Sequence, residues 1–252
     1  MSERRYVPLR AACGEPHACP APVRRRVLAA TALFGDLGER EIADVGERMT
    51  ARSWAAGEYL YVEGDPADDL YVLASGRAKM TRTDADGAEI VLDVLGPGDL
   101  FGGVASLGMG VHGDSVMALQ TTCALRIDSE GFRTLLGDYP AVAVRAFDEV
   151  AGQLSSTRAA FAAVTGTVAQ RVAGALVRLA AKFGDPGPDG VLLQVPLTRA
   201  DLAGMTGSTT ESVSRAMSAM RRDGVIDTGR KWTAITDMAA LRELAEGRFP
   251  DN

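Results

Sequence analysis

The spacing of hydrophobic and polar positions changes along the chain, and each change predicts a different kind of element. From residue 23 to residue 50 apolar side chains recur every three or four positions, with a break around Gly35, which is typical of amphipathic helices. From Trp54 onward the chain has short runs in which apolar and polar residues alternate, separated by glycine-containing turns. The runs are YLYV, DLYVL, AKMTRT, EIVLDVL and SVMALQTTCALRI. Short strands of this kind predict a sandwich or barrel, and Asp86-Gly87 between two of them predicts a hairpin.

Helical spacing returns at about residue 129 and predicts a short helix over residues 131–136 and a long one. The long helix opens at Pro140 and covers the alanine-rich stretch 141–164. Its apolar stripe needs a partner, for which a coiled-coil-like contact with a second copy is the natural choice; packing on its own domain is the alternative. Three elements follow: a helix over residues 168–183, a loop over 184–190 and the strand VLLQVPL, which ends at Thr198.

The segment TRADLAGMTGSTTESVSRAMSAMRRDGVI predicts two short helices joined by a turn at Gly207, the arrangement of a helix-turn-helix. The candidate N-caps are Thr198 for the first helix, over residues 199–205, and Ser208 or Thr209 for the second, which runs to about residue 223. Downstream, VIDTGRKWTAI predicts a two-stranded wing with Gly229, Arg230 and Lys231 at its tip, near a phosphate. An ordinary helical hairpin with solvated charges is the alternative.

The second of these helices is predicted to have two faces. The residues expected to face the core are Val213, Met217 and Met220. The exposed N-terminal part, which enters the major groove in this motif, carries Thr210, Glu211, Ser214 and Arg215. An arginine can donate two hydrogen bonds to guanine, and a glutamate can accept one from the amino group of cytosine.

Charge is distributed unevenly along the chain. The formal net charge of the 252 residues is -6, which by itself argues weakly against a nucleic-acid partner. The C-terminal part nevertheless holds Arg215, Arg221, Arg222, Arg230 and Lys231 against only Asp223 and Asp227. A locally basic end is the feature that matters for docking on DNA.

Composition also excludes other classes of protein. The chain has 2 histidines, and it contains no nucleophile–base constellation, P-loop or HExxH motif, so we do not expect an enzyme. A module for protein contacts is the other rival. No apolar run approaches the ~18–20 residues of a membrane span, and the first residues lack the apolar core of a secretory signal. We therefore expect a cytoplasmic protein with no membrane partner.

The order of these parts resembles the cAMP-receptor-protein/FNR family from about Leu33 to Leu244. The matching segments are GEYLYVEGDPADDLYVLASGRAKM, GPGDLFGG, VTGTVAQRVAGAL and LTRADLAGMTGSTTESVSRAMSAMRRDGVI. The resemblance implies an α+β chain with four parts: a cysteine-containing arm (1–22), an antiparallel β-roll or jelly-roll sensor (23–137), a dimerisation helix (138–165) and a winged helix-turn-helix (166–252). It also implies a homodimer that binds double-stranded DNA and RNA polymerase.

The recognition helix is similar to that of the FNR branch, which carries an E-x-x-S-R pattern. Here the pattern is Glu211, Ser214 and Arg215. The resemblance implies a palindromic operator with TTGAT-like half-sites, in which Arg215 reads guanine, Glu211 reads across the pair and Ser214 assists nearby. The full set of expected DNA contacts is Thr198, Arg199, Ser208, Thr209, Thr210, Glu211, Ser214, Arg215, Arg230 and Lys231.

Cyclic-nucleotide binding in this family uses residues that this chain lacks. Gly103 occupies the position of the glutamate that binds the ribose. Asp114, before Ser115, occupies that of the arginine that neutralises the cyclic phosphate, and Gly152-Gln153 replaces the Thr-Ser pair offered to adenine. We therefore do not expect cAMP as a ligand.

The cysteines offer another kind of sensor. The spacing Cys13-x5-Cys19 is similar to the last N-terminal pair of the FNR proteins, which hold a 4Fe–4S iron–sulfur cluster with one further cysteine in the β-roll. Arg10 replaces the first cysteine of that pattern, and Cys123 lies two residues before the nominal distal position, Leu125, on the same face of a strand. The candidate iron ligands are therefore Cys13, Cys19 and Cys123, with His17, a nearby carboxylate or an exogenous group as the fourth.

Several alternatives to the cluster stay open. One is a thiol/disulfide or zinc switch on Cys13, His17 and Cys19. Another is a haem or other small ligand, although His112, in a glycine-rich loop, is expected to be exposed. In the last, there is no cofactor and Cys123 is a small buried hydrophobic residue.

Overall fold

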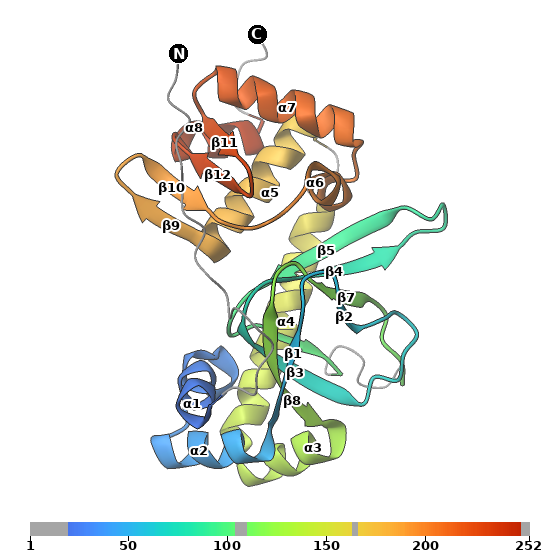
Figure 1. Cartoon of the computed structure of the whole chain (residues 1–252), viewed down its shortest axis with the longest axis vertical. Helices are drawn as coiled ribbons and strands as arrows, with labels where there is room; N and C mark the ends of the chain where they lie inside the picture. The colour runs from blue at the N-terminus through green and yellow to red at the C-terminus, as the bar shows by residue number, and fades with distance from the viewer. Residues whose placement is uncertain (1–19, 104–109, 163–165, 248–252) are drawn as a thin grey trace. The chain divides into compact units, whose positions relative to one another are not determined.

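The computed structural model describes residues 20–103, 110–162 and 166–247 (Figure 1). These residues fall into two compact units. One unit comprises residues 12–84 and 92–160, and the other comprises residues 85–91 and 161–252, within the described ranges. Among the helices of the described ranges, none is long and apolar enough to cross a membrane.

The first unit is built on two four-stranded sheets with the orders β1-β8-β3-β6 and β2-β7-β4-β5. The strands of the first sheet are β1 (Thr50–Trp54), β3 (Asp69–Ser75), β6 (Leu100–Gly102) and β8 (Thr122–Asp128). Those of the second are β2 (Tyr59–Tyr61), β4 (Ala78–Thr83), β5 (Glu89–Leu95) and β7 (Ser115–Ala118). Strand β8 pairs antiparallel with β1 and β3, and β7 pairs antiparallel with β2 and β4. The predicted antiparallel β-roll is confirmed.

Strand β3 is apolar at successive positions because both of its faces are covered. Tyr71 and Leu73 pack between the two sheets, together with Tyr61 and Val116 from the second sheet. Val72 lies in a separate cluster that joins the other face of the first sheet to helices. A strand with two buried faces loses the polar positions that an exposed face would show.

The helical cover of the sheet starts before the strands. Its elements are α1 (Ala21–Ala30), the 3-10 turn η1 (Ala32–Phe34), α2 (Glu39–Arg48) and α3 (Ser129–Asp138). The predicted helical stretch 23–50 is thus divided into two helices and a turn. The prediction that strands start at Trp54 is wrong by four residues, because Thr50 already pairs with Arg126 on β8.

One prediction about the strands is wrong and another is confirmed. The run SVMALQTTCALRI was expected to be continuous, but it forms β7 and β8, which belong to different sheets. Residues 119–121 carry the chain from one sheet to the other. The hairpin predicted at Asp86-Gly87 is confirmed, because β4 and β5 are neighbours and Gly87 has a φ of 82°, a conformation that glycine adopts without steric cost.

The long helix α4 (Pro140–Ala162) begins at the proline that the sequence indicates. The residues that would form its predicted stripe stay largely exposed: Val144 is 63% exposed, Phe147 73%, Val150 46% and Leu154 52%. The last part of the predicted helix, residues 163–164, lies outside the described residues.

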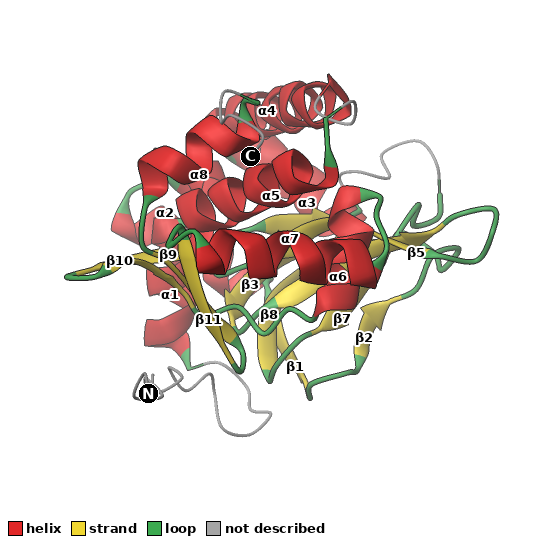
Figure 2. Cartoon of the chain, turned by 90° about the horizontal axis from the view of Figure 1, so that it is seen from above, coloured by secondary structure: helices red, strands yellow, loops and turns green. Residues whose placement is uncertain are grey.

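The second unit is a small sheet with four helices. The helices are α5 (Val168–Phe183), α6 (Arg199–Thr206), α7 (Thr210–Arg222) and α8 (Met238–Ala245). The strands are β9 (Gly184–Gly187), β10 (Gly190–Leu193), β11 (Ile226–Gly229) and β12 (Trp232–Ile235), in the order β11-β12-β10-β9. Helix α5 contacts α6, α7 and α8 (Figure 2). The predicted two-helix motif and wing are confirmed.

Two predictions around β10 are wrong. The stretch 184–190, expected to be a loop, contains the strand β9, which pairs with β10 from Gly184 to Gly187. Pro186 is tolerated there because β9 is an edge strand, where one ladder hydrogen bond is not needed. The strand expected to run to Thr198 ends at Leu193, and Pro196, which has no amide hydrogen, lies in the irregular segment that follows.

Candidate nucleic-acid interface

Helix α6 begins at a capping box. The amide of Asp201 donates to Thr198 Oγ1 at 3.1 Å, and the amide of Thr198 donates to the Asp201 carboxylate at 2.7 Å. Both interactions satisfy amide groups that the first turn of a helix leaves unpaired. The prediction of Thr198 as the N-cap is confirmed. Asp201 is buried while Thr198 is exposed, so the cap holds an exposed hydroxyl at the start of the helix.

The turn between α6 and α7 has a glycine at its C-cap and a threonine at its N-cap. Gly207 adopts the left-handed conformation, with a φ of 56°, which ends α6. Thr209 caps α7 by accepting from the amide of Ser212 at 3.2 Å. Ser208, the other candidate cap, does not cap the helix: its hydroxyl accepts instead from Arg171 Nη2 at 2.8 Å.

Arg171 is a residue that the sequence analysis missed. From α5 its Nε donates to the carbonyl of Thr206 at 2.7 Å, and its Nη1 donates to the carbonyl of Gly166. Thr206 is the last residue of α6, so the guanidinium satisfies an unpaired carbonyl at the negative end of that helix. Together with the bond to Ser208, these contacts attach the turn of the helix-turn-helix to α5.

Helix α7 has one buried and one exposed face, as the sequence predicts. Val213, Met217 and Met220 are at most 2% exposed. On the opposite side Arg215 Nη2 forms an ion pair with Glu211 Oε1, four positions earlier in the helix, and the two side chains are 76% and 73% exposed. An exposed pair of this kind contributes only about 0.3–0.5 kcal/mol, so either group can exchange it for another partner at little cost.

Ser214 is less available than its neighbours on α7. It is half-buried, and its hydroxyl donates to the carbonyl of Thr210 at 2.8 Å. A hydroxyl used in this way can still accept a hydrogen bond from outside.

The wing turns sharply between β11 and β12. Arg230 and Lys231 form the two-residue connection, and Lys231 has a φ of 64°, the one positive φ at a non-glycine among the described residues. Both side chains are exposed. The predicted position of these cations at the tip of the wing is confirmed.

All residues predicted to contact DNA belong to the second unit. The exposed ones are Thr198, Thr209, Thr210, Glu211, Arg215, Arg230 and Lys231, and the half-buried ones are Arg199, Ser208 and Ser214. Burial lowers the pKa of the Arg199 guanidinium. Within the described part of the chain no side chain or carbonyl pairs with Arg199.

The β-roll contains a polar and aromatic cluster around Asp114, the residue that the family resemblance aligns with the phosphate-binding arginine. Tyr61 donates its hydroxyl hydrogen to Asp114 Oδ1 at 2.9 Å. The Tyr61 ring stacks on His112, with centroids 3.6 Å apart. Burial raises the pKa of the Asp114 carboxyl, opposed by the Tyr61 hydrogen bond. The Asp114 carboxyl therefore already accepts a hydrogen bond from Tyr61. Being acidic, it cannot neutralise a phosphate as an arginine would.

The backbone around Gly103 leaves little room for a side chain. Its amide donates to the carbonyl of Asp69 at 2.6 Å. A Cβ atom placed on Gly103 would lie 2.9 Å from the same oxygen and 3.0 Å from that of Ala67. A glutamate here would therefore require the backbone to shift. Gly152 lies on α4, and the side chain of Gln153 is outside the described residues.

The prediction that His112 is exposed is wrong. The side chain is 4% exposed, and its backbone amide and carbonyl bond to Asp65 and Gly64. Burial lowers the pKa of His112, opposed by the nearby carboxylate of Asp114. Stacking on Tyr61 places the ring inside the β-roll, which the glycine-rich sequence around it does not indicate.

Cys123 lies in the core of the β-roll. It is 1% exposed and belongs to the cluster that contains Leu125, Val72 and Leu28. The expectation that Cys123 and Leu125 share a face is confirmed. Cys13, His17 and Cys19 lie outside the described residues. In the described part, no three histidine, cysteine or acidic side chains are grouped to hold a metal ion. An apolar enclosure does not fit a cluster ligand that the arm must reach.

Comparison with known proteins matches both units. A model of the cyclic nucleotide-binding domain matches residues 51–139, and a model of the Crp-like helix-turn-helix domain matches residues 170–244. The chain is 30% identical over 216 residues to the cyclic AMP receptor protein of Thermus thermophilus, covering 85% of this chain and 97% of that protein. It is 28% identical to the transcriptional activator protein FnrL of Cereibacter sphaeroides, covering 91% and 92%.

Comparison with solved structures leads to the same family. The crystal structure of a CRP-family transcriptional regulator from Thermus thermophilus matches with a TM-score of 0.66 and 27% identity, covering 77% of this chain and 96% of that one. The chain belongs to the CRP/FNR family of DNA-binding transcription regulators, which are not enzymes.

Replacing Arg171 by alanine is expected to weaken DNA binding through the position of α7. The carbonyl of Thr206 and the hydroxyl of Ser208 lose a charged donor, which costs about 2–3 kcal/mol of folding free energy. Arg178→Ala is the matched control, because Arg178 is exposed on the same helix. Urea unfolding and DNA titrations measure both effects. If the two variants had equal stability and equal DNA affinity, the role given to Arg171 would be wrong.

Proposed function

We propose that the chain acts as a homodimer on a palindromic operator with TTGAT-like half-sites. The observation that carries this proposal is the exposed pair of Glu211 and Arg215 on the face of α7 opposite its buried side. Arg215 reads guanine with two hydrogen bonds, and Glu211 accepts from the amino group of cytosine across the groove. Ser214 contributes at a neighbouring base or phosphate.

The remaining contacts position the protein on the DNA backbone. They are Thr198 and Arg199 at the start of α6, Ser208, Thr209 and Thr210 around the start of α7, and Arg230 and Lys231 on the wing. Hydroxyls, cations and helix N-termini are the groups that contact phosphates in such complexes. Ser208 is the least available of them, because Arg171 already uses its hydroxyl.

The dimer is proposed from the apolar side chains that α4 leaves exposed. Phe147 is 73% exposed and Val144 63%, whereas large hydrophobic side chains at helical spacing are normally covered. A second α4 from a symmetric copy would cover them and bring two recognition helices to one palindrome. RNA polymerase is the further partner that the family resemblance implies.

The proposed signal is redox or gas chemistry at the cysteines of the arm, with an iron–sulfur cluster favoured. The spacing of Cys13 and Cys19 supports the cluster, and His17, a nearby carboxylate or an exogenous group would supply the remaining ligands. The burial of Cys123 argues against Cys123 as a ligand. Thiol oxidation, haem, another small ligand and a regulator without a cofactor remain the alternatives.

Cyclic AMP is not the proposed signal, because the β-roll offers an acid where the phosphate would lie. Asp114 is held by Tyr61, and His112 fills the neighbouring space. A carboxylate beside a phosphate is repulsive, and partial burial strengthens that repulsion.

Replacing Arg215 by alanine should abolish the preference for the TTGAT palindrome. Each half-site loses about 1–3 kcal/mol of discrimination, whereas binding to unrelated DNA at low salt changes little. Arg222→Ala is the matched control, because Arg222 is an exposed arginine in the last turn of the same helix. Fluorescence anisotropy with specific and scrambled palindromes measures the ratio. An unchanged ratio in the Arg215 variant would overturn the assignment.

Calorimetric titration with cAMP is expected to give no saturable heat. A cAMP-binding member of the family, titrated in the same buffer, shows that the assay detects binding. Saturable binding in the micromolar range would contradict the exclusion of cAMP.

Protein purified without oxygen is expected to show the visible absorption of an iron–sulfur cluster and about four irons per chain. Cys13→Ser and Cys19→Ser should remove both. A colourless, metal-free protein that still binds the palindrome would refute the cluster and leave the regulator intact.

A further inference from the structure

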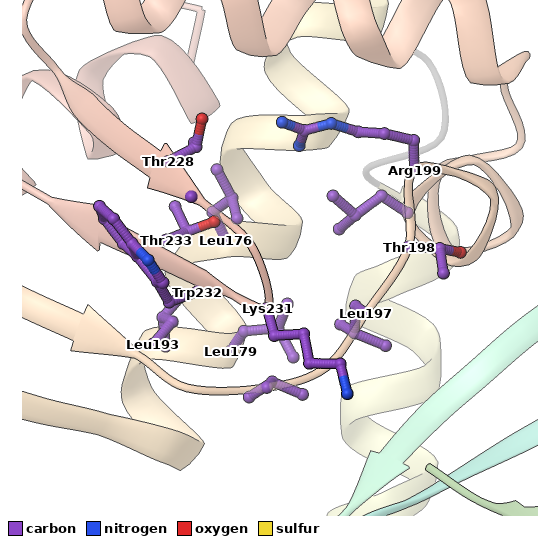
Figure 3. A pocket seen from close by; sticks show the side chains of 13 residues that line it. Leu176, Leu179, Leu193, Leu197, Thr198, Arg199, Thr228, Lys231, Trp232 and Thr233 are labelled. Atoms are coloured by element: carbon purple, nitrogen blue, oxygen red, sulfur yellow. The ribbon is translucent and has the colours of Figure 1, made fainter. Parts of the chain in front are cut away.

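A cavity lies between the wing and the start of α6, inside the second unit (Figure 3). Its volume is about 240 Å³. The apolar side chains that line it come from α5, from α6 and from the chain around β10: Leu176, Leu179, Leu193, Val195, Leu197 and Leu202. Trp232 on β12 contributes an aromatic wall. The predicted contacts with DNA do not require a cavity at this place, so they do not explain why it is there.

Two cations line the same cavity. Figure 3 shows Arg199 extending from the start of α6 and Lys231 from the turn of the wing. Arg199 is half-buried and has no ion-pair or hydrogen-bond partner among the described residues, and its burial lowers its pKa. Placing a guanidinium partly out of water without a partner has a cost that an anion would offset.

We propose that this cavity binds a small amphipathic carboxylate, whose tail lies on the leucines and whose head group binds Arg199, while Lys231 adds positive charge at another edge of the cavity. The volume is enough for a short-chain or single-ring acid. Apolar walls with a few convergent polar groups are the usual composition of a small-molecule site. The hydroxyls of Thr228 and Thr233 add further donors at its edge.

Binding of such an acid opposes DNA binding, an effect that rests on the proposed function of Arg199 and Lys231 as phosphate contacts. A carboxylate and a DNA phosphate cannot both occupy Arg199. By linkage, acid at ten times its Kd lowers the apparent affinity for the palindrome about tenfold for each chain, and about a hundredfold for a dimer with two sites, if binding is exclusive. The DNA-binding unit then carries a ligand response that is separate from the β-roll.

Octanoate is the probe, and Trp232 is the reporter. The chain has 2 tryptophans, so Trp54→Phe leaves Trp232 as the single tryptophan, whose emission can be excited apart from that of the tyrosines in the full-length protein. We expect a saturable change in fluorescence with octanoate. Octanol and octylammonium, with the same tail, should bind about tenfold more weakly or not at all, because they lack the charge-assisted hydrogen bonds.

Two variants place the binding in the cavity. Leu197→Phe fills it and should abolish the octanoate response while binding to the palindrome is retained. Lys231→Gly removes one cation at a position whose φ of 64° glycine adopts freely, and it should weaken octanoate but not octanol. The proposal would be overturned if both variants bound octanoate as tightly as the parent protein. It would also be overturned if octanoate, octanol and octylammonium bound with equal affinity.

The same titrations separate this inference from the proposed function. If the wild-type chain binds the palindrome but not octanoate, the ligand site is wrong and the regulator stands. If it binds octanoate but shows no preference for the palindrome, the site stands and the proposed operator is wrong. If both bind and octanoate leaves DNA affinity unchanged, the proposed competition is refuted.

Discussion

The proposed reading of DNA depends on how one helix is oriented about its own axis. Helix α7 buries Val213, Met217 and Met220 against its unit, and that burial directs Glu211 and Arg215 away from the core. Each buried side chain contributes roughly 1.5–3 kcal/mol relative to exposure, far more than the exposed Glu211–Arg215 pair. Packing therefore fixes the orientation, and the ion pair is weak enough for a base to replace one of its partners, as the proposed DNA contacts require.

The turn before α7 fixes where the helix begins on the unit against which it packs. Gly207 ends α6, Thr209 starts α7, and Arg171 attaches the turn to α5 through Thr206 and Ser208. The caps join residues that are close in sequence, whereas the contacts of Arg171 join residues that are far apart in sequence. A helix placed by buried side chains and short hydrogen bonds can present a base-reading side chain with the precision that a bidentate contact requires.

The parts of the site that could be predicted from sequence are those whose partners lie within a few residues. The cap at Thr198 and the two faces of α7 follow from spacings of three and four, whereas the sequence leaves the cap of α7 open between Ser208 and Thr209. Arg171 could not be found in this way, since its partner Thr206 lies 35 positions away. The burial of His112 depends on Tyr61 from another strand.

The fold shows the same division. Strand alternation and turn signals predict the β-roll, whereas β9 depends on pairing with β10, which its proline- and glycine-rich sequence conceals. A shared fold does not by itself fix a shared ligand. The family resemblance assigns to Asp114 the position of the phosphate-binding arginine, and in the structure Asp114 accepts a hydrogen bond from Tyr61, whose ring stacks on His112.

The most direct test of the central claim is the stoichiometry and spacing dependence of operator binding. On a palindrome of two TTGAT half-sites centred about one helical turn apart, the account predicts two chains per duplex and much weaker binding to one half-site. Inserting about 5 base pairs between the half-sites rotates them by half a turn and should abolish the gain. One chain bound per palindrome, or an affinity that ignores the insertion, would contradict the account.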